Sequence, residues 1–193
     1  MINRTGNLYT LLYALILAAF VAGVLAWVST SLAPRRKANE EAAKIAFIRA
    51  AAAMPEASVD SLESAGLRVF RAMTEEDTIF VLPCSGSGLW GPIWGYIALE
   101  EDTCLVRGAA FDHKSETPGL GSRIGEKAFG SLFSGRRFGE GLYSASADAV
   151  SGATETSRGV EKMVLECVER YSACFDSTGR FLIIEEPKED EQL

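Results

Sequence analysis

The residues with the clearest capacity for chemistry lie between Asp148 and Thr154, where the chain reads Asp-Ala-Val-Ser-Gly-Ala-Thr. Small residues and hydroxyl side chains stand here just before a helix-like run at 160–171. A helix start presents unpaired backbone N–H groups and the positive end of the peptide dipole, so it binds phosphate well. Gly152 and Ala153 permit close approach of a ligand, and Thr154 offers an oxygen for a covalent bond. The segment predicts a phosphate site, and an ordinary Ser/Thr helix cap is the alternative interpretation.

Two more segments contain glycines next to apolar side chains. Residues 88–99 read Gly-Leu-Trp-Gly-Pro-Ile-Trp-Gly-Tyr-Ile-Ala-Leu, and residues 113–121 read His-Lys-Ser-Glu-Thr-Pro-Gly-Leu-Gly. In the second segment, Gly119 and Gly121 allow a ligand to approach the backbone, and Leu120 offers an apolar face. A structural turn is the alternative interpretation of the second segment.

These three segments, in this order, resemble the FMN-binding domain found in the C subunit of the sodium-translocating NADH:quinone reductases, and the related G subunit of Rnf complexes is similar. An apolar N-terminal segment in the corresponding position extends the resemblance, which covers the chain from about Asn7 to about Lys162. The resemblance implies covalently bound FMN, attached by a phosphoester to the Thr154 hydroxyl. It also implies a separate flavin transferase that takes FMN from FAD and recognises the signature Asp148, Ser151, Gly152, Ala153 and Thr154.

Further residues are expected around the flavin. Ser151, Thr156 and Ser157 are candidates to donate hydrogen bonds to the phosphate, and Arg158 to add positive charge. The resemblance places Glu116, Thr117, Gly119 and Leu120 against the flavin ring, with Thr117 bonding its polar edge. Trp90 is expected either on the flavin or in the core, and Trp94 in the core. His113, the only histidine, is expected to be a hydrogen-bonding loop residue, and it has no companion motif for a catalytic triad.

The formal net charge of −7 disfavours nucleic acid as a partner, because the chain has no basic patch to release counterions from phosphates. No charged residue lies between Arg4 and Arg35. A helix needs about 20 apolar residues to cross a bilayer, so this segment predicts a membrane anchor, flanked by Tyr9, Tyr13 and Trp27. A cleaved signal peptide is the rival interpretation, but its apolar region is about 7–15 residues long.

The orientation of the anchor is predicted differently by two arguments. Arg35, Arg36 and Lys37 follow the apolar segment, and positive residues favour the cytoplasmic side. The family resemblance implies the opposite, a C-terminal domain on the outer, periplasmic face of the cytoplasmic membrane. We follow the resemblance in expecting a single-pass protein with a periplasmic domain.

The four cysteines, at positions 84, 104, 167 and 174, have no Cys-x-x-Cys spacing, so neither a zinc nor an iron–sulfur site is expected. If one helix runs through Cys167 and Cys174, their Cα atoms are about 10 Å apart, too far for a disulfide. A Cys84–Cys104 disulfide stays possible in an oxidising compartment. Buried thiols are the expectation for most of the four.

The pattern of the chain predicts an α+β fold with antiparallel strands and segregated helices. Helices are expected at 37–54 (ending before Pro55), 125–133 and 160–171. Strands are expected at 78–82, 92–99, 104–111 and 180–184, with a loop at 113–122 and a loop or edge strand at 135–147. The expected organisation is an anchor at 1–34, a helical connector at 35–55, an FMN-binding domain at 56–184 and an acidic tail at 185–193.

The functional hypothesis is a membrane-anchored electron-transfer subunit that carries covalent FMN in a redox-driven sodium pump, which oxidises NADH and reduces a quinone such as ubiquinone. Its partners would be the other subunits of the complex, and it would not be catalytic alone. An Rnf-type G subunit is the nearest alternative, and a flavin-free anchored interaction module is an alternative from another class.

Overall fold

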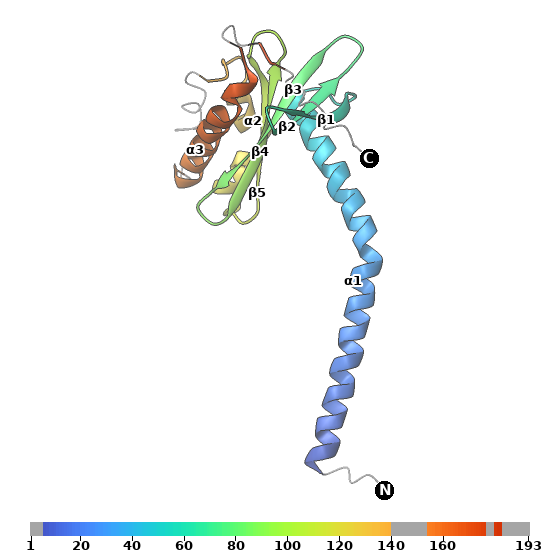
Figure 1. Cartoon of the computed structure of the whole chain (residues 1–193). Coiled ribbons are helices and arrows are strands. Elements are labelled where there is room, and N and C mark those ends of the chain that lie inside the picture. The colour runs from blue at the N-terminus through green and yellow to red at the C-terminus, as the bar shows by residue number, and fades with distance from the viewer. Residues whose placement is uncertain (1–5, 140–153, 177–179, 183–193) are drawn as a thin grey trace. The chain divides into compact units, whose positions relative to one another are not determined.

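The computed structural model describes residues 6–139, 154–176 and 180–182. The chain forms two units, Met1–Lys44 and Ile45–Leu193, which are described separately. Figure 1 labels the helices and strands.

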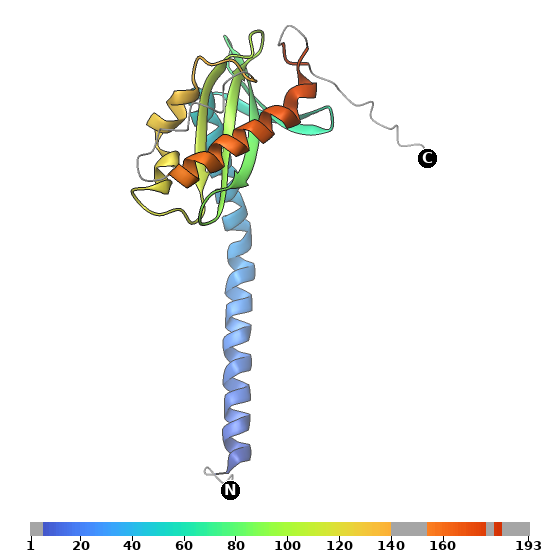
Figure 2. The same cartoon turned by 90° about the vertical axis from the view of Figure 1, so that its left-hand side faces the viewer.

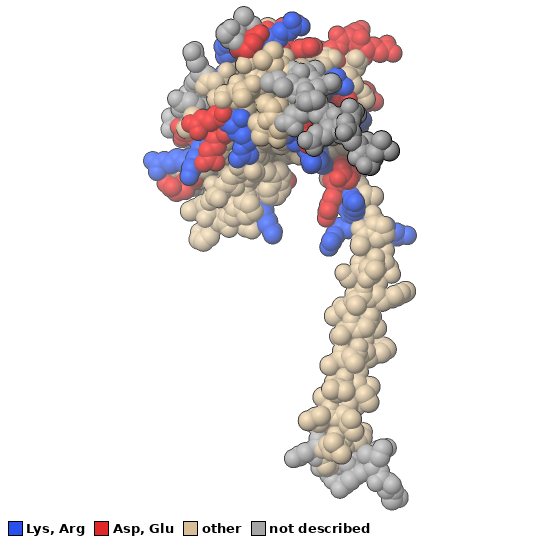
Figure 3. Space-filling model, in the orientation of Figure 1, with Lys and Arg blue, Asp and Glu red and all other residues tan. Residues whose placement is uncertain are grey.

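The first unit consists of most of helix α1 (Asn7–Ala52), which is continuous through Pro34. The predicted anchor and connector therefore share one helix. Its apolar side chains from Leu8 to Leu32 are exposed, and Figure 3 shows a stretch without acidic or basic residues along it. By length and composition this helix is able to cross a membrane. It ends where Ala53 adopts a φ of 56°, shortly before Pro55, as the sequence predicts.

The second unit is built on an antiparallel sheet whose five strands neighbour one another in chain order. The strands are β1 (Ser58–Ser64), β2 (Leu67–Met73), β3 (Thr78–Ser87), β4 (Pro92–Glu100) and β5 (Val106–His113). The predicted hairpin around residues 100–103 is present as β4–β5, and β3 extends five residues beyond its predicted end at Leu82. The predicted α+β fold with antiparallel strands is confirmed.

The β1–β2 hairpin was not predicted. Ser64 pairs with Leu67, so the connection is the dipeptide Ala65-Gly66, with φ values of 52° and 70°. Positive φ values at both central residues characterise the type I′ turn, whose backbone twist matches that of the two paired strands. Alanine is an unusual residue at such a position, so the sequence lacks the Asn-Gly or Asp-Gly signal that marks most hairpins of this kind.

The sheet has an apolar core on each face. Along β3, Phe80 and Leu82 belong to one core and Ile79 and Val81 to the other, because successive strand side chains point to opposite faces. Helix α3 (Thr154–Tyr171) covers the first face (Figure 2), with Val160, Met163 and Val164 buried. The last turns of α1 cover the second face, with Ile48, Ala51 and Ala52 buried.

The predicted helix at 125–133 is a series of short turns: η1 (Gly121–Gly125), α2 (Lys127–Gly130) and η2 (Ser131–Phe133). Of the predicted strand at 180–184, only an isolated bridge between Phe175 and Phe181 is observed, and residues 183 and 184 lie outside the described residues. The predicted segment at 135–147 contributes a bridge from Arg137 to Leu105, and it too lies partly outside the described residues.

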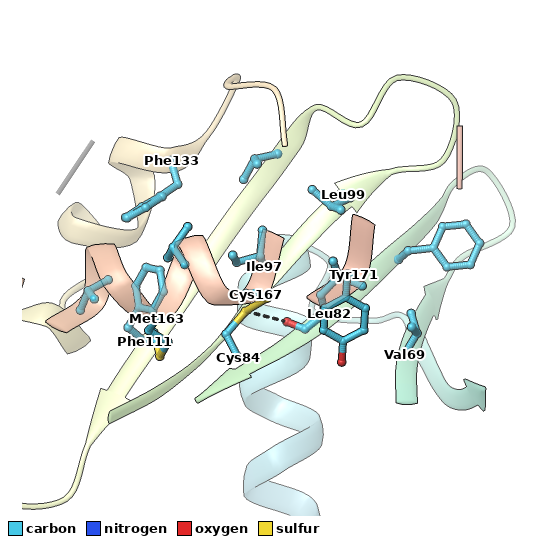
Figure 4. Close-up of a cluster of buried hydrophobic side chains, with 14 of the residues drawn as sticks. Val69, Leu82, Cys84, Ile97, Leu99, Phe111, Phe133, Met163, Cys167 and Tyr171 are labelled. Carbon is cyan, nitrogen blue, oxygen red and sulfur yellow. Dashed lines mark hydrogen bonds between the residues drawn. A yellow bond between two sulfur atoms is a disulfide. The ribbon is translucent and has the colours of Figure 1, made fainter. Parts of the chain in front are cut away.

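A disulfide joins Cys84 of β3 to Cys167 of α3 within the first core (Figure 4). The suggested Cys84–Cys104 pair is therefore wrong. Cys104 and Cys174 are buried thiols, so the expectation of buried thiols holds for two of the four cysteines and not for most of them. Sequence spacing gave no indication of the pair, because it depends on the side of α3 that packs on β3.

Candidate functional site

Thr154 is the first residue of α3, and its side chain is exposed. The helix begins six residues before the start of the predicted run, so Thr154, Thr156 and Ser157 all lie in its first turn. The free N–H groups and positive dipole end of this turn favour an anionic group. The signature residues Asp148, Ser151, Gly152 and Ala153 lie outside the described residues.

Glycines bring the beginning of α3 against the end of β3. A Cβ atom on Gly159 would lie 2.6 Å from the backbone oxygen of Ser87, and one on Gly86 would lie 2.8 Å from the Cβ of Met163. No side chain fits at either contact without movement of the helix. Gly159 and Gly86 therefore set how closely the first turns of α3 approach the β3–β4 loop.

The β3–β4 loop at 88–91 is a tight turn in which the Gly88 N–H donates to the Gly91 oxygen at 2.8 Å. Its central side chains point outward, with Leu89 54% and Trp90 66% exposed. The alternative that Trp90 belongs to the core is therefore wrong. Trp94 is only partly buried, so the expectation of a core position is not met for this residue either.

The loop after β5 is folded on itself. The Leu120 and Ser122 N–H groups both donate to the Thr117 oxygen, and Gly119 adopts a φ of 75°, which a glycine tolerates. Thr117 and Gly119 are exposed and Leu120 is 43% exposed. His113 accepts a hydrogen bond at Nδ1 from the Glu116 N–H at 3.3 Å, so its expected hydrogen-bonding role is observed. The expectation that it lies in a loop is wrong, because His113 is the last residue of β5 and pairs with Ile93 of β4.

Glu116 connects the two loops and the helix. Its side chain is buried, and its oxygens accept hydrogen bonds from the Trp90 N–H at 2.9 Å and from the Thr156 hydroxyl at 2.6 Å. The structure thus brings together Trp90, Glu116 and the first turn of α3, which are far apart in the sequence.

Two residues expected at the phosphate have buried side chains. Thr156 is 2% exposed and donates to Glu116, and Ser157 is fully buried. Arg158 is exposed and forms an ion pair with Glu155 at 2.8 Å. Sequence reasoning missed the roles of Gly159 and Gly86, for which the only local signal is a glycine inside a helix or strand.

The arrangement suits a flat ligand with a phosphate tail. Exposed apolar side chains at Leu89, Trp90 and Leu120 offer surfaces for a ring, and Thr154 presents a hydroxyl at a helix N-terminus. A separate apolar groove of about 570 Å³ lies between the end of α1, β5 and residues 125–127, and it contains none of the predicted site residues.

Comparison with known proteins points to the same segments of the chain. Residues 88–169 match the FMN-binding domain family, and this range includes the β3–β4 loop, the loop after β5 and nearly all of α3. The C subunit of the sodium-translocating NADH-quinone reductase of Chlamydia trachomatis is 38% identical over 81 residues, 42% of this chain and 24% of the relative. That of Neisseria meningitidis serogroup A is 34% identical over 95 residues, 42% of this chain and 37% of the relative.

The chain therefore matches only 24% and 37% of the length of these two curated relatives. A solved structure, the C subunit of the same type of reductase from Parabacteroides distasonis, superposes with a TM-score of 0.62 at 25% identity, and it is matched over 74% of this chain and 96% of its own. In sequence and in fold, the chain resembles the C subunit of the sodium-translocating NADH-quinone reductases and has a match to the FMN-binding domain family.

Proposed function

We propose that the chain is a membrane-anchored electron-transfer subunit of a sodium-translocating NADH:quinone reductase, with FMN bound covalently to Thr154. The observation that carries the proposal is the position of Thr154: an exposed hydroxyl at the N-terminus of α3, on the helix turn that Glu116 ties to the two predicted ring-binding loops. The match of residues 88–169 to the FMN-binding domain family supports it.

Attachment would join the Thr154 oxygen to the flavin phosphate. A flavin transferase would move FMN from FAD to the hydroxyl, so that a phosphoester forms, AMP leaves and the hydroxyl proton is released. The exposure of Thr154 suits this reaction because an enzyme must reach the oxygen. The tether would keep the flavin at its site whatever its intrinsic affinity.

The residues of this chain would hold and shield the cofactor. The first turn of α3 would face the phosphate, while Trp90 and Leu120 would pack on the ring and Thr117 would bond its polar edge. Asp148, Ser151, Gly152 and Ala153 would complete the signature that the transferase recognises. Flavin supplies the ability to exchange one or two electrons, and the chain would relay them between other subunits.

Mass spectrometry tests the attachment directly. In protein made together with the flavin transferase, the tryptic peptide at 138–158 should gain the mass of FMN less water, with the addition at Thr154. Thr154→Val should abolish the addition and the flavin fluorescence of the denatured band, with the fold retained because the side chain is exposed. An unmodified peptide from the parent chain would favour the flavin-free interaction module.

The proposal takes the C subunit of a sodium pump in preference to an Rnf-type G subunit, because the relatives described above bear the former name. Identification of the proteins that copurify with the chain would separate the two. A complex without the other sodium-pump proteins would count against the proposal.

We also propose that α1 is a single-pass anchor and that the C-terminal domain is periplasmic. The Cys84–Cys167 disulfide supports this orientation, because disulfides persist in oxidising compartments and are rare in the cytosol. Arg35, Arg36 and Lys37 argue for the opposite orientation. A reporter that is active only in the cytoplasm, fused after Leu193, should be inactive, and clear activity would contradict the proposed topology.

A further inference from the structure

Glu116 is a buried acidic residue at the centre of the candidate site. Its side chain is 4% exposed. Oε1 accepts from the Trp90 N–H, 26 positions away, and Oε2 accepts from the Thr156 hydroxyl, 40 positions away. Each carboxylate oxygen therefore has a partner within the protein, and the two partners belong to different segments.

The surroundings of Glu116 compensate for the burial of a carboxylate. Removing a polar group from water is unfavourable unless hydrogen bonds replace those to solvent. The 2.6 Å bond from Thr156 is short, as hydrogen bonds to carboxylates are. Thr156 also lies in the first turn of α3, whose positive dipole end favours a negative charge.

Two glycines of the site lie in close contact with this carboxylate. A Cβ atom on Gly88 would overlap Oε1, and a Cβ on Gly121 would lie 2.6 Å from Oε2 and 2.7 Å from the Thr156 oxygen. A larger residue at either position would therefore require the Glu116 carboxylate to move from its observed place. The carboxylate fills the space where the β3–β4 loop, the loop after β5 and α3 meet.

We propose that Glu116 is a positioning residue for the flavin site and does not contact the cofactor. By holding the Trp90 backbone and the Thr156 side chain, it fixes the β3–β4 loop and the first turn of α3 relative to the loop that carries Leu120. The exposed Trp90 and Leu120 side chains and the Thr154 hydroxyl thereby keep their relative positions. The inference rests on the proposed function, and it assigns to Glu116 a role other than the direct cofactor contact expected from the sequence.

One arm of the test needs no flavin. In the full chain with Thr154→Val, amide hydrogen exchange is measured by mass spectrometry for peptides that contain residues 88–91. Glu116→Ala should speed exchange in this loop about tenfold or more, because the Trp90 N–H loses its acceptor. Glu116→Gln keeps an acceptor for the Trp90 N–H and an amide that donates to the Thr156 oxygen, so exchange should stay close to that of the parent.

The second arm uses the flavin-bearing chain, made together with the transferase. Glu116→Ala should change the visible circular dichroism of the flavin and its reduction potential, whereas Glu116→Gln should reproduce both parent values. Thr156→Val removes only the hydrogen bond between Glu116 and α3, so it replaces Glu116→Ala as the test variant if Glu116→Ala does not fold. Thr156→Val should also change the flavin signature, with Thr156→Ser as the matched control that keeps the hydroxyl.

Three results would overturn the inference. The first is unchanged hydrogen exchange of the 88–91 loop in Glu116→Ala, and the second is an unchanged flavin signature in Thr156→Val. The third is a Glu116→Gln chain whose loop exchange matches the parent but whose flavin reduction potential is shifted as far as in Glu116→Ala. The last result would mean that the charge acts on the flavin itself. A parent chain without flavin would instead refute the proposed function, and the exchange arm would still test the role of Glu116.

Discussion

Cys84 and Cys167 tie β3 to α3 through a disulfide that spans 83 positions of the sequence, with Cα atoms 5.6 Å apart. The bond lies in the core between α3 and the sheet, beside Met163 and Leu82 (Figure 4). It fixes the C-terminal part of the helix whose first residue is Thr154, so the candidate attachment site lies on an element that is covalently joined to the sheet.

Reduction of this disulfide should lower the free energy of unfolding by about 2–5 kcal/mol, because the bond restricts the unfolded chain over a long loop. Denaturant unfolding of the oxidised and reduced protein measures the difference. A variant with Cys104→Ala and Cys174→Ala is the control, and it should show the same dependence on reductant. Equal stability of the two redox forms would mean that the pair is not bonded in the folded protein.

Gly159→Ala tests the close approach of α3 to β3. Alanine normally stabilises a helix by about 1 kcal/mol relative to glycine. Here the new Cβ would lie 2.6 Å from the Ser87 backbone oxygen, so we expect a loss of about 1–3 kcal/mol by thermal or denaturant unfolding, and less covalent flavin. Gly125→Ala is the control, since its Cβ would meet only the Phe111 oxygen at an ordinary 3.5 Å. A Gly159→Ala protein more stable than its parent would contradict the close approach.

Leu120→Ala tests the proposed ring contact. Leu120 is 43% exposed, so its truncation should lower stability by about 1 kcal/mol or less. The covalent flavin content should be unchanged because the tether is at Thr154, while the flavin absorbance band and potential shift. Leu132→Ala is a matched control, 39% exposed and outside the site, and it should leave the spectrum unaltered. If both variants have the parent spectrum, the loop after β5 is only a structural turn.

The buried thiol of Cys104 should make the folded protein less stable at alkaline pH. Burial raises the pKa of its thiol from 9.0 to about 11, since the buried site disfavours the thiolate. The folded protein therefore holds this proton more tightly than the unfolded chain, and the resulting stabilisation is complete below pH 9 and is lost as the pH rises towards 11. The melting temperature of the parent should fall more steeply over this interval than that of Cys104→Ala. If the melting temperatures of the two proteins fall in parallel with pH, Cys104 does not contribute to the loss of stability.

The amino-acid sequence alone determined those helices and strands in which apolar residues recur at a regular spacing. The uncharged segment between Arg4 and Arg35 predicted the apolar helix, and alternation at 92–99 and 104–111 predicted β4 and β5. These patterns are readable because strand and helix periods place apolar residues on one face without reference to distant residues. The motifs also led to the FMN-binding domain, which the family match over 88–169 supports.

Only the tertiary structure decided which distant residues meet. The Cys84–Cys167 pair, the outward Trp90 and the inward Glu116 all depend on how α3 packs on the sheet. No local period specifies such contacts, because they join segments 26 to 83 positions apart and are selected by close packing of the whole core. The sequence named Glu116 and Thr156 as separate candidates, and their hydrogen bond exists only because the fold buries both side chains in the same place.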